Sequence, residues 1–154
     1  MTIENYVKTG KIAAEVREMV RVKDWIGKTV YEICEEVENE IRKRGAKCAF
    51  PVNASINEIA AHYTAEPNDP ITIKDTDLVK IDLGAQIDGY IADTAVTVCY
   101  DAQFDGLVQA AEEALGSAMS MIKTGVKASD IGRTIETTIK QMGFKPIANL
   151  SGHS

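Results

Sequence analysis

The stretch LVKIDLGAQIDGYIADTAVTV, residues 78–98, decides the fold of this chain. An Asp-Gly pair between two runs of alternating apolar residues is typical of a β-hairpin with a two-residue loop, so we expect two strands that turn at Asp88 and Gly89. Side chains alternate between the two faces of a strand. With this turn, Asp82 and Asp93 project from the same face of the hairpin.

The two aspartates then become diagonal neighbours on adjacent strands, with Cα atoms roughly 7–8 Å apart. Gly84 and Ala95 share their face. Two acids within an apolar strand pair repel each other and lose hydration, so a cation, a proton or a basic side chain must compensate. We interpret the pair as a site for divalent cations. The alternatives are that Asp82 caps a strand end and Asp93 is solvated, or that a longer, bulged loop separates them.

Composition restricts the class of protein. The chain has 154 residues, 45% of them hydrophobic, which is enough for a real core and favours one domain. Its formal net charge of −6 argues against nucleic acid or an anionic membrane as the main partner. No apolar run approaches the roughly 18 residues of a membrane span. Three well-separated cysteines without a CxxC motif indicate a reducing compartment, and we expect the cytoplasm.

Hydrophobic periodicity predicts helices and strands in a mixed α/β order. The first helix buries a stripe that runs from Ile12 to Val20, and Pro51 makes the following strand an edge strand or an irregular one. We expect Ser129 to be the N-cap of the last helix. The elements expected are helices over 3–21, 30–44, 104–123 and 129–142, strands over 48–56 and from 145 to the end, the hairpin, and a loop over 57–77.

An apparent internal repeat relates the two parts of the chain. At an offset of 98 residues the following positions correspond: Gly27, Ile33, Val37, Glu38, Ile41 and Gly45 with Gly125, Ile131, Ile135, Glu136, Ile139 and Gly143. Residues 53–55 and 149–151 also correspond, at an offset of 96 residues. We interpret this as a duplication within a single domain, with a first pseudo-repeat over about 1–100 and a second over 101–154. The second hairpin is missing, so we expect a fragment or one piece of a split protein.

The chain has two histidines, and the sequence leaves their roles open. His153 follows a glycine that would allow a sharp turn to present the imidazole inward, but a lone histidine is more often structural. His62 lies in the polar loop and is an ordinary exposed residue on the simplest interpretation. The spacing indicates no Ser/His/Asp or Cys/His arrangement and no phosphate-binding glycine loop.

Three stretches resemble the methionine aminopeptidases, specifically the archaeal members of the type II class: FPVNASINEIAAHYT, VKIDLGAQIDGYIADTAVTV and NLSGH. The resemblance covers essentially the whole chain. It implies the α/β (α+β) "pita-bread" fold of the creatinase/aminopeptidase group, here incomplete. That fold consists of a first helix–helix–sheet half and a second half related by a pseudo-twofold axis, with the metals between them.

The resemblance also implies roles for individual residues. Asp82, Asp93 and His153 match the family's metal ligands, and His62 matches a catalytic histidine that contacts the substrate. Phe50 matches a residue that lines the pocket for the methionine side chain. The family binds two divalent ions (Co, Mn, Fe or Zn), and two further glutamate ligands and another histidine would follow Ser154.

The expected function is therefore removal of the N-terminal methionine from nascent polypeptides by a two-metal aminopeptidase. We expect the 154 residues alone to be inactive, to bind metal weakly or not at all, and to self-associate. Two alternatives remain: a non-catalytic pita-bread binding or adaptor protein, and another hydrolase of this fold that acts on X-Pro bonds or creatine.

Overall fold

The structure, a computed structural model, describes residues 3–152 and is mixed α/β. The chain divides into two compact units, Met1–Asp101 (the N-terminal unit) and Ala102–Ser154 (the C-terminal unit). The elements in chain order are α1 (Ile3–Val22), α2 (Val30–Lys43), β1 (Lys47–Cys48), β2 (Asn53–Ile56), β3 (Leu78–Ile87), β4 (Tyr90–Cys99), the short 3₁₀ helix η1 (Ala102–Phe104), α3 (Asp105–Met121) and α4 (Ala128–Gln141). Among the described residues, no helix combines the length and the apolarity that crossing a membrane would require.

Helices α1 and α2 form where the periodicity predicts them. In α1 the predicted stripe from Ile12 to Val20 is buried, whereas Ile3 and Val7, which fit the pattern loosely, are exposed. Helix α2 begins with a capping box: the Thr29 hydroxyl accepts a hydrogen bond from the Glu32 amide at 3.1 Å, and the Glu32 carboxylate accepts one from the Thr29 amide at 2.8 Å. These bonds satisfy amides that the first helical turn leaves unpaired.

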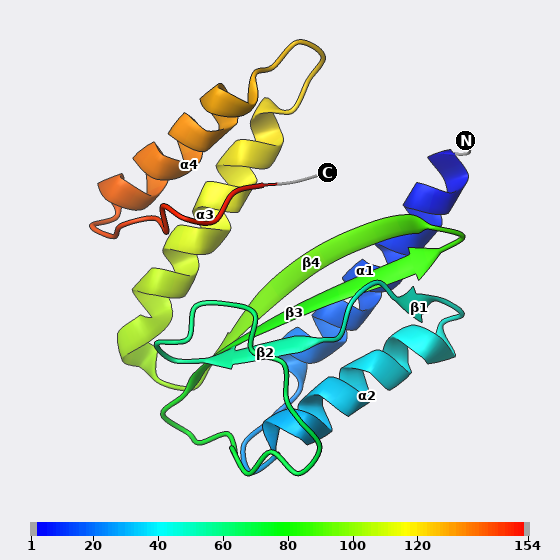
Figure 1. The fold of residues 1–154 in the computed structure, drawn as a ribbon. Helices are drawn as coiled ribbons and strands as arrows, with labels where there is room; N and C mark the ends of the chain where they lie inside the picture. The colour runs from blue at the N-terminus through cyan, green and yellow to red at the C-terminus, as the bar shows by residue number, and fades with distance from the viewer. Residues whose placement is uncertain (1–2, 153–154) are drawn as a thin grey trace. The chain divides into compact units, whose positions relative to one another are not determined.

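β3 is the central strand of the antiparallel sheet in the N-terminal unit and forms a long hairpin with β4 (Figure 1). β4 pairs with one edge of β3, and β1 and β2 pair in turn with the other edge. Lys47 pairs with Gln86, and Asn53 pairs with Asp82. The connection between β1 and β2 is therefore two residues longer than the stretch of β3 opposite it, and it bulges. The irregularity predicted at Pro51 is confirmed.

The two faces of this sheet have different chemistry. One face packs against α1 and α2 through a row of buried residues of β3 that includes Ile81 and Leu83. On the same face, Arg17 of α1 donates a hydrogen bond to the Thr94 hydroxyl at 3.1 Å. Burying each large aliphatic side chain contributes about 1.5–3 kcal/mol, so this core fixes which residues of the hairpin face inward. The opposite face carries Asp82 and Asp93.

The C-terminal unit corrects three predictions. Helix α4 begins at Ala128 with Lys127 as its N-cap and without a side-chain cap bond, so the prediction of Ser129 as N-cap was wrong. In α3 the buried row consists of Ala110, Ala114 and Ala118. The periodicity over 104–123 predicts a buried stripe that also includes Leu107, Leu115 and Ile122, but these three side chains are exposed. Residues 145–152 form no strand. A strand needs a hydrogen-bonding neighbour, and the described part of this unit contains no other strand to pair with.

Corresponding features of the two units recur at the offset of 98 residues. Helices α2 and α4 begin and end 98 residues apart. The glycines that flank the two helices all have a left-handed φ, between +81° and +87°. Matching backbone hydrogen bonds close the turns before and after each helix. Before the helices these are Lys28 N to Trp25 O (3.0 Å) and Val126 N to Lys123 O (3.1 Å); after them they are Gly45 N to Arg42 O and Gly143 N to Lys140 O (both 3.0 Å), and Ala46 N to Ile41 O (3.3 Å) and Phe144 N to Ile139 O (3.1 Å). These observations support the proposed duplication, which remains a prediction.

Candidate functional site

The β3–β4 turn has the geometry that the sequence predicts. Asp88 (φ +52°) and Gly89 (φ +83°) are both left-handed, as a two-residue type I′ turn requires. Gly84 pairs with Asp93, and Asp82 pairs with Ala95. The predicted register is therefore confirmed. Since residues at pair positions share a face, both carboxylates leave the sheet on the side away from α1 and α2.

The two acids differ in exposure. Asp82 lies on the central strand β3 and is half-buried, whereas Asp93 lies on β4 and is exposed. Carboxylate oxygens are hard ligands that suit divalent cations, so this donor pair fits the metal that the sequence predicts. Within residues 3–152, no group of three or more histidine, cysteine or acidic side chains is placed to hold a metal ion. The predicted ligand His153 lies outside the described residues.

Phe50 lies directly over the strand that carries Asp82. A β-carbon built at Gly84 would collide with the Phe50 ring, with Cδ1 only 2.8 Å away, and would lie 3.0 Å from the β-carbon of Ala49. Gly84 pairs with Asp93 and is two residues from Asp82, so the phenyl ring covers the strand position that lies next to both aspartates on this face. The bulge between β1 and β2 holds the ring there, with Ala49 N donating to Gly84 O at 2.9 Å.

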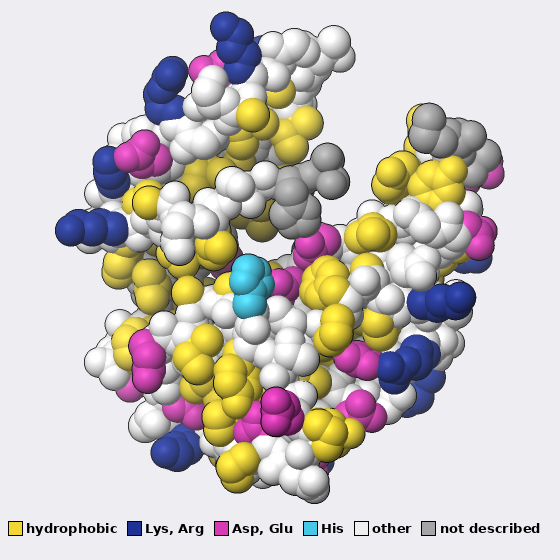
Figure 2. Space-filling view, viewed as in Figure 1, with side chains coloured by type: hydrophobic (Ala, Val, Ile, Leu, Met, Phe, Trp, Pro, Cys, Tyr) yellow, Lys and Arg dark blue, Asp and Glu magenta, His cyan; other side chains and the backbone are white. Residues whose placement is uncertain are grey.

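His62 lies on a loop that is attached to the outer edge of β2. Ala54 N donates to Tyr63 O at 2.9 Å, and Tyr63 N donates to the Ser55 hydroxyl at 3.2 Å. Ser55 projects from the same face as Asp82, because it follows Asn53, the partner of Asp82, by two residues. His62 itself is exposed and has a left-handed φ of +67°. Figure 2 shows a histidine side chain standing at the molecular surface.

Two acids of the long loop, Asp69 and Asp77, have local structural roles. Asp77 is buried, where its carboxylate accepts hydrogen bonds from Lys74 N and from the Asn57 side chain, both at 2.9 Å. Asp69 accepts hydrogen bonds from Ile71 N at 2.9 Å and from the Tyr63 hydroxyl at 2.6 Å. These bonds fix the turns of the long loop.

Sequence reasoning missed Asn53 and Ser55, the two polar side chains with which β2 lines this face. Asn53 is only 9% exposed and lies opposite Asp82 in the sheet. The available signal was the alternation of polar and apolar residues in Asn-Ala-Ser-Ile, which places both polar residues on one face.

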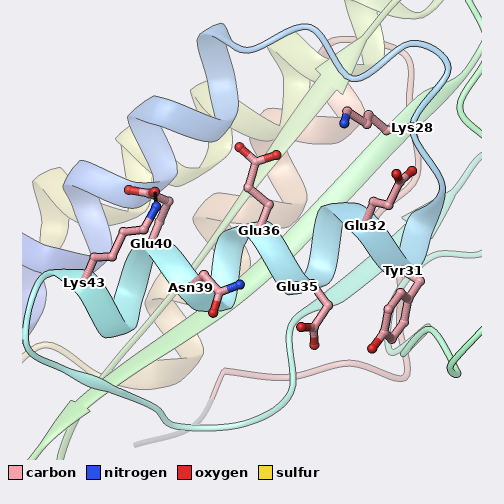
Figure 3. Close-up of a pocket in the computed structure, with 8 residues that line it drawn as sticks. All are labelled: Lys28, Tyr31, Glu32, Glu35, Glu36, Asn39, Glu40 and Lys43. Atoms are coloured by element: carbon pink, nitrogen blue, oxygen red, sulfur yellow. Dashed lines mark hydrogen bonds and ion pairs between the residues drawn. The ribbon is translucent and has the colours of Figure 1, made fainter.

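A separate surface hollow of about 420 Å³ lies along the outer face of α2 and is lined by several glutamates (Figure 3). Most of these acids have partners. Glu32 caps its own helix, Glu36 pairs with Lys23, and Glu40 pairs with Lys43 at 2.7 Å and with Arg44. Hydrogen bonds from these two basic side chains lower the pKa of Glu40. This surface has the character of a solvated helix face with ion pairs.

The geometry above agrees with comparisons to known proteins. Residues 4–154 match the metallopeptidase family M24. The chain belongs to this family. It is 50% identical over 153 residues to a methionine aminopeptidase of Pyrococcus abyssi and 47% identical over 156 residues to one of Methanocaldococcus jannaschii. Each alignment covers 99% of this chain, and the chain spans 52% and 53% of the lengths of these M24 relatives.

Solved structures of M24 proteins share the fold. A methionine aminopeptidase of Thermotoga maritima superposes with a TM-score of 0.88 at 29% identity over 99% of this chain and 66% of that one. A prolidase of Pyrococcus furiosus gives a TM-score of 0.81 at 26% identity over 92% of this chain and 43% of that one. The predicted fold class is confirmed: the chain is mixed α/β and covers the first part of the pita-bread fold.

Proposed function

We propose that the complete protein is a methionine aminopeptidase that removes the N-terminal methionine from nascent polypeptides. The observation that carries this proposal is the arrangement on one sheet face, where Asp82 and Asp93 flank a glycine covered by the Phe50 ring. This arrangement offers metal-binding oxygens next to an apolar surface for a substrate side chain. The identity of 46–50% to the methionine aminopeptidases of several archaea supports the same substrate.

Asp82 and Asp93 would hold the divalent ions, with His153 as a further proposed ligand. Bound divalent metal lowers the pKa of water and polarises a carbonyl, which is the chemistry that peptide hydrolysis needs. Sequence chemistry does not select among Co, Mn, Fe and Zn. The three cysteines are free thiols, which supports the cytoplasm as the location.

Two side chains would act on the substrate. The Phe50 ring contributes apolar contact for the methionine side chain, beside the carboxylates. The exposed His62 would donate a hydrogen bond near the scissile peptide bond and so orient it. Holding the reacting groups in one geometry supplies a large share of an enzyme's rate enhancement.

The test is hydrolysis of Met-Gly-Met by the complete gene product loaded with Mn²⁺. We expect turnover, and we expect D82N and D93N each to lower kcat/KM more than about 100-fold, since even outer-shell partners of a metal contribute 10–100-fold. D75N, a change in a loop acid, is the matched control. An enzyme that leaves Met-Gly-Met intact but cleaves an X-Pro peptide would identify the alternative hydrolase.

The 154-residue polypeptide by itself should be inactive. Its described residues supply two carboxylates to the site, fewer ligands than a stable two-metal site needs. Calorimetric titration with Mn²⁺ should therefore show weak binding, abolished by D82N. A chain that binds no Mn²⁺ even when complete would favour the adaptor alternative.

A further inference from the structure

Asn53 connects the two segments that carry the proposed substrate contacts. It is the first residue of β2 and is 9% exposed. It pairs with Asp82 of the neighbouring strand β3, so the two side chains project from the same face of the sheet. Its Nδ2 group donates one hydrogen bond to the Pro51 carbonyl at 2.8 Å and another to the Thr64 hydroxyl at 3.1 Å. The first partner follows Phe50 in the bulge, and the second lies two residues beyond His62.

We propose that Asn53 is a positioning residue that couples the Phe50 bulge to the His62 loop. The inference rests on the proposed function, in which these two side chains contact the substrate. An amide nitrogen carries two donors, and here each acceptor takes one of them. Alanine has no donor and aspartate has only acceptors when ionised, so neither can replace this connection.

Both segments need such a restraint. The bulge is held at its ends by the bond from Ala49 N to Gly84 O and by the bond from Val52 N to the Glu38 carboxylate at 3.2 Å. Between them, Pro51 has no amide hydrogen and is held through its carbonyl. His62 adopts a left-handed φ that non-glycine residues rarely adopt and that persists only where neighbours enforce it. Displacement of a reacting group by about 1 Å can cost 100-fold in rate.

The two bonds of Asn53 predict different kinetic effects. T64V removes only the acceptor beside His62, so we expect kcat for Met-Gly-Met to fall about 10-fold with little change in KM. N53A releases both segments, so kcat should fall and KM should rise. T64S keeps the hydroxyl, so its kcat and KM should equal those of the wild type. T72V, at another exposed threonine of the same loop, is the matched control and should change neither constant.

A second measurement does not depend on turnover. The NMR signal of the His62 imidazole, assigned by its loss in H62Q, should shift in N53A and in T64V and stay in place in T72V. Since Thr64 is exposed, T64V should fold even if N53A does not. If the wild type cleaves no methionine peptide, the proposed function is wrong and the NMR shifts alone decide the connection. An unmoved His62 signal, or T64V kinetics equal to those of T72V, would overturn the inference.

Discussion

Gly84 is the residue at which the site tolerates no added atom. Its missing side chain leaves the space that the Phe50 ring fills, and a β-carbon added at this glycine would lie only 3.0 Å from the β-carbon of Ala49. We expect G84A to push the ring away and to destabilise the fold by about 1–3 kcal/mol, the usual cost of overpacking. G10A is the control, because a β-carbon there meets nothing within 4 Å in a helix. Chemical denaturation of both variants measures the difference, and equal stabilities would contradict the prediction.

Cys34 should be the least reactive thiol of the chain. Burial under the sheet raises its pKa to about 11, and its thiol donates to Val52 O at 3.3 Å. A raised pKa keeps the group protonated, so about one molecule in a thousand carries the thiolate at pH 8. Burial also raises the pKa of Cys48, which is only partly buried. Iodoacetamide labelling followed by mass spectrometry should modify Cys34 last, and rapid labelling at neutral pH would show that the core opens locally.

At the scale of residues, alternation along a strand predicts which side chains share a face. Together with the position of the turn, it was sufficient to predict that Asp82 and Asp93 project from the same face. Asn53 was not predictable in the same way. Its bonds reach the bulge at Pro51 and the loop at Thr64, and those positions are brought to it by the fold rather than by sequence spacing. The proposed role of His62 comes from family resemblance alone, because a lone exposed histidine has no periodicity to interpret.

At the scale of elements, the first turn of α2 offers a direct comparison with that of α4. Thr29 caps α2, and its counterpart 98 residues later, Lys127, makes no side-chain cap bond. We expect T29A to cost about 1 kcal/mol of folding free energy, as loss of a threonine N-cap usually does. K127A should leave stability unchanged. Guanidinium denaturation of the two variants measures both effects, and an equal loss in both would contradict the prediction.

The penalty of T29A should also depend on pH. Hydrogen bonds from the Thr29 backbone and hydroxyl lower the pKa of Glu32. A carboxylate whose pKa is lower in the folded state stabilises it above the unfolded-state pKa, and this stabilisation is lost as the pH falls through the folded-state pKa. T29A removes the bond from the Thr29 hydroxyl to the Glu32 carboxylate, which is 3.0 Å long, so the difference between T29A and wild type should shrink in acid. A difference that is constant down to pH 2 would exclude this bond as a contributor to the penalty.

Element boundaries were predictable where the sequence contains a backbone signal. Gly45 and Gly143 end α2 and α4 because each adopts the left-handed φ that closes a helix. Asp88 and Gly89 made the position of the hairpin turn predictable for the same reason, since both adopt a left-handed φ. Ser129 failed as an N-cap signal because Lys127 already has the extended backbone of an N-cap, and the serine falls within the first turn. Side-chain preference is weaker than the backbone geometry set by the preceding turn.

At the scale of the whole molecule, the two units bury the same helical positions. Ala110, Ala114 and Ala118 of α3 are buried, and they lie 98 residues after Ile12, Val16 and Val20 of α1, which are also buried. In the N-terminal unit these larger side chains pack against the sheet. The smaller alanines leave α3 with less buried apolar area, so burial of this row stabilises α3 less than burial of the matching row stabilises α1. The smaller size of the buried row in α3 could be predicted from the sequence only after the two repeats were aligned.

Exposed apolar residues of α3 predict self-association of the 154-residue polypeptide. Leu115 is 57% exposed and Met119 is 62% exposed, and Figure 2 shows hydrophobic side chains gathered over this unit. The equivalent positions of α1 carry Arg17 and Arg21. Contiguous exposed apolar surface promotes association, so the sedimentation coefficient of the wild-type polypeptide should rise with concentration.

The double variant L115R/M119R replaces both residues by the arginines of the first repeat. Its sedimentation coefficient should not change with concentration. Q109R/S120R adds the same charge at exposed polar positions of α3 and should still associate, which separates removal of apolar surface from a general charge effect. A wild-type boundary independent of concentration would show that this face does not drive association. Association that persists in L115R/M119R would place the contact elsewhere on the chain.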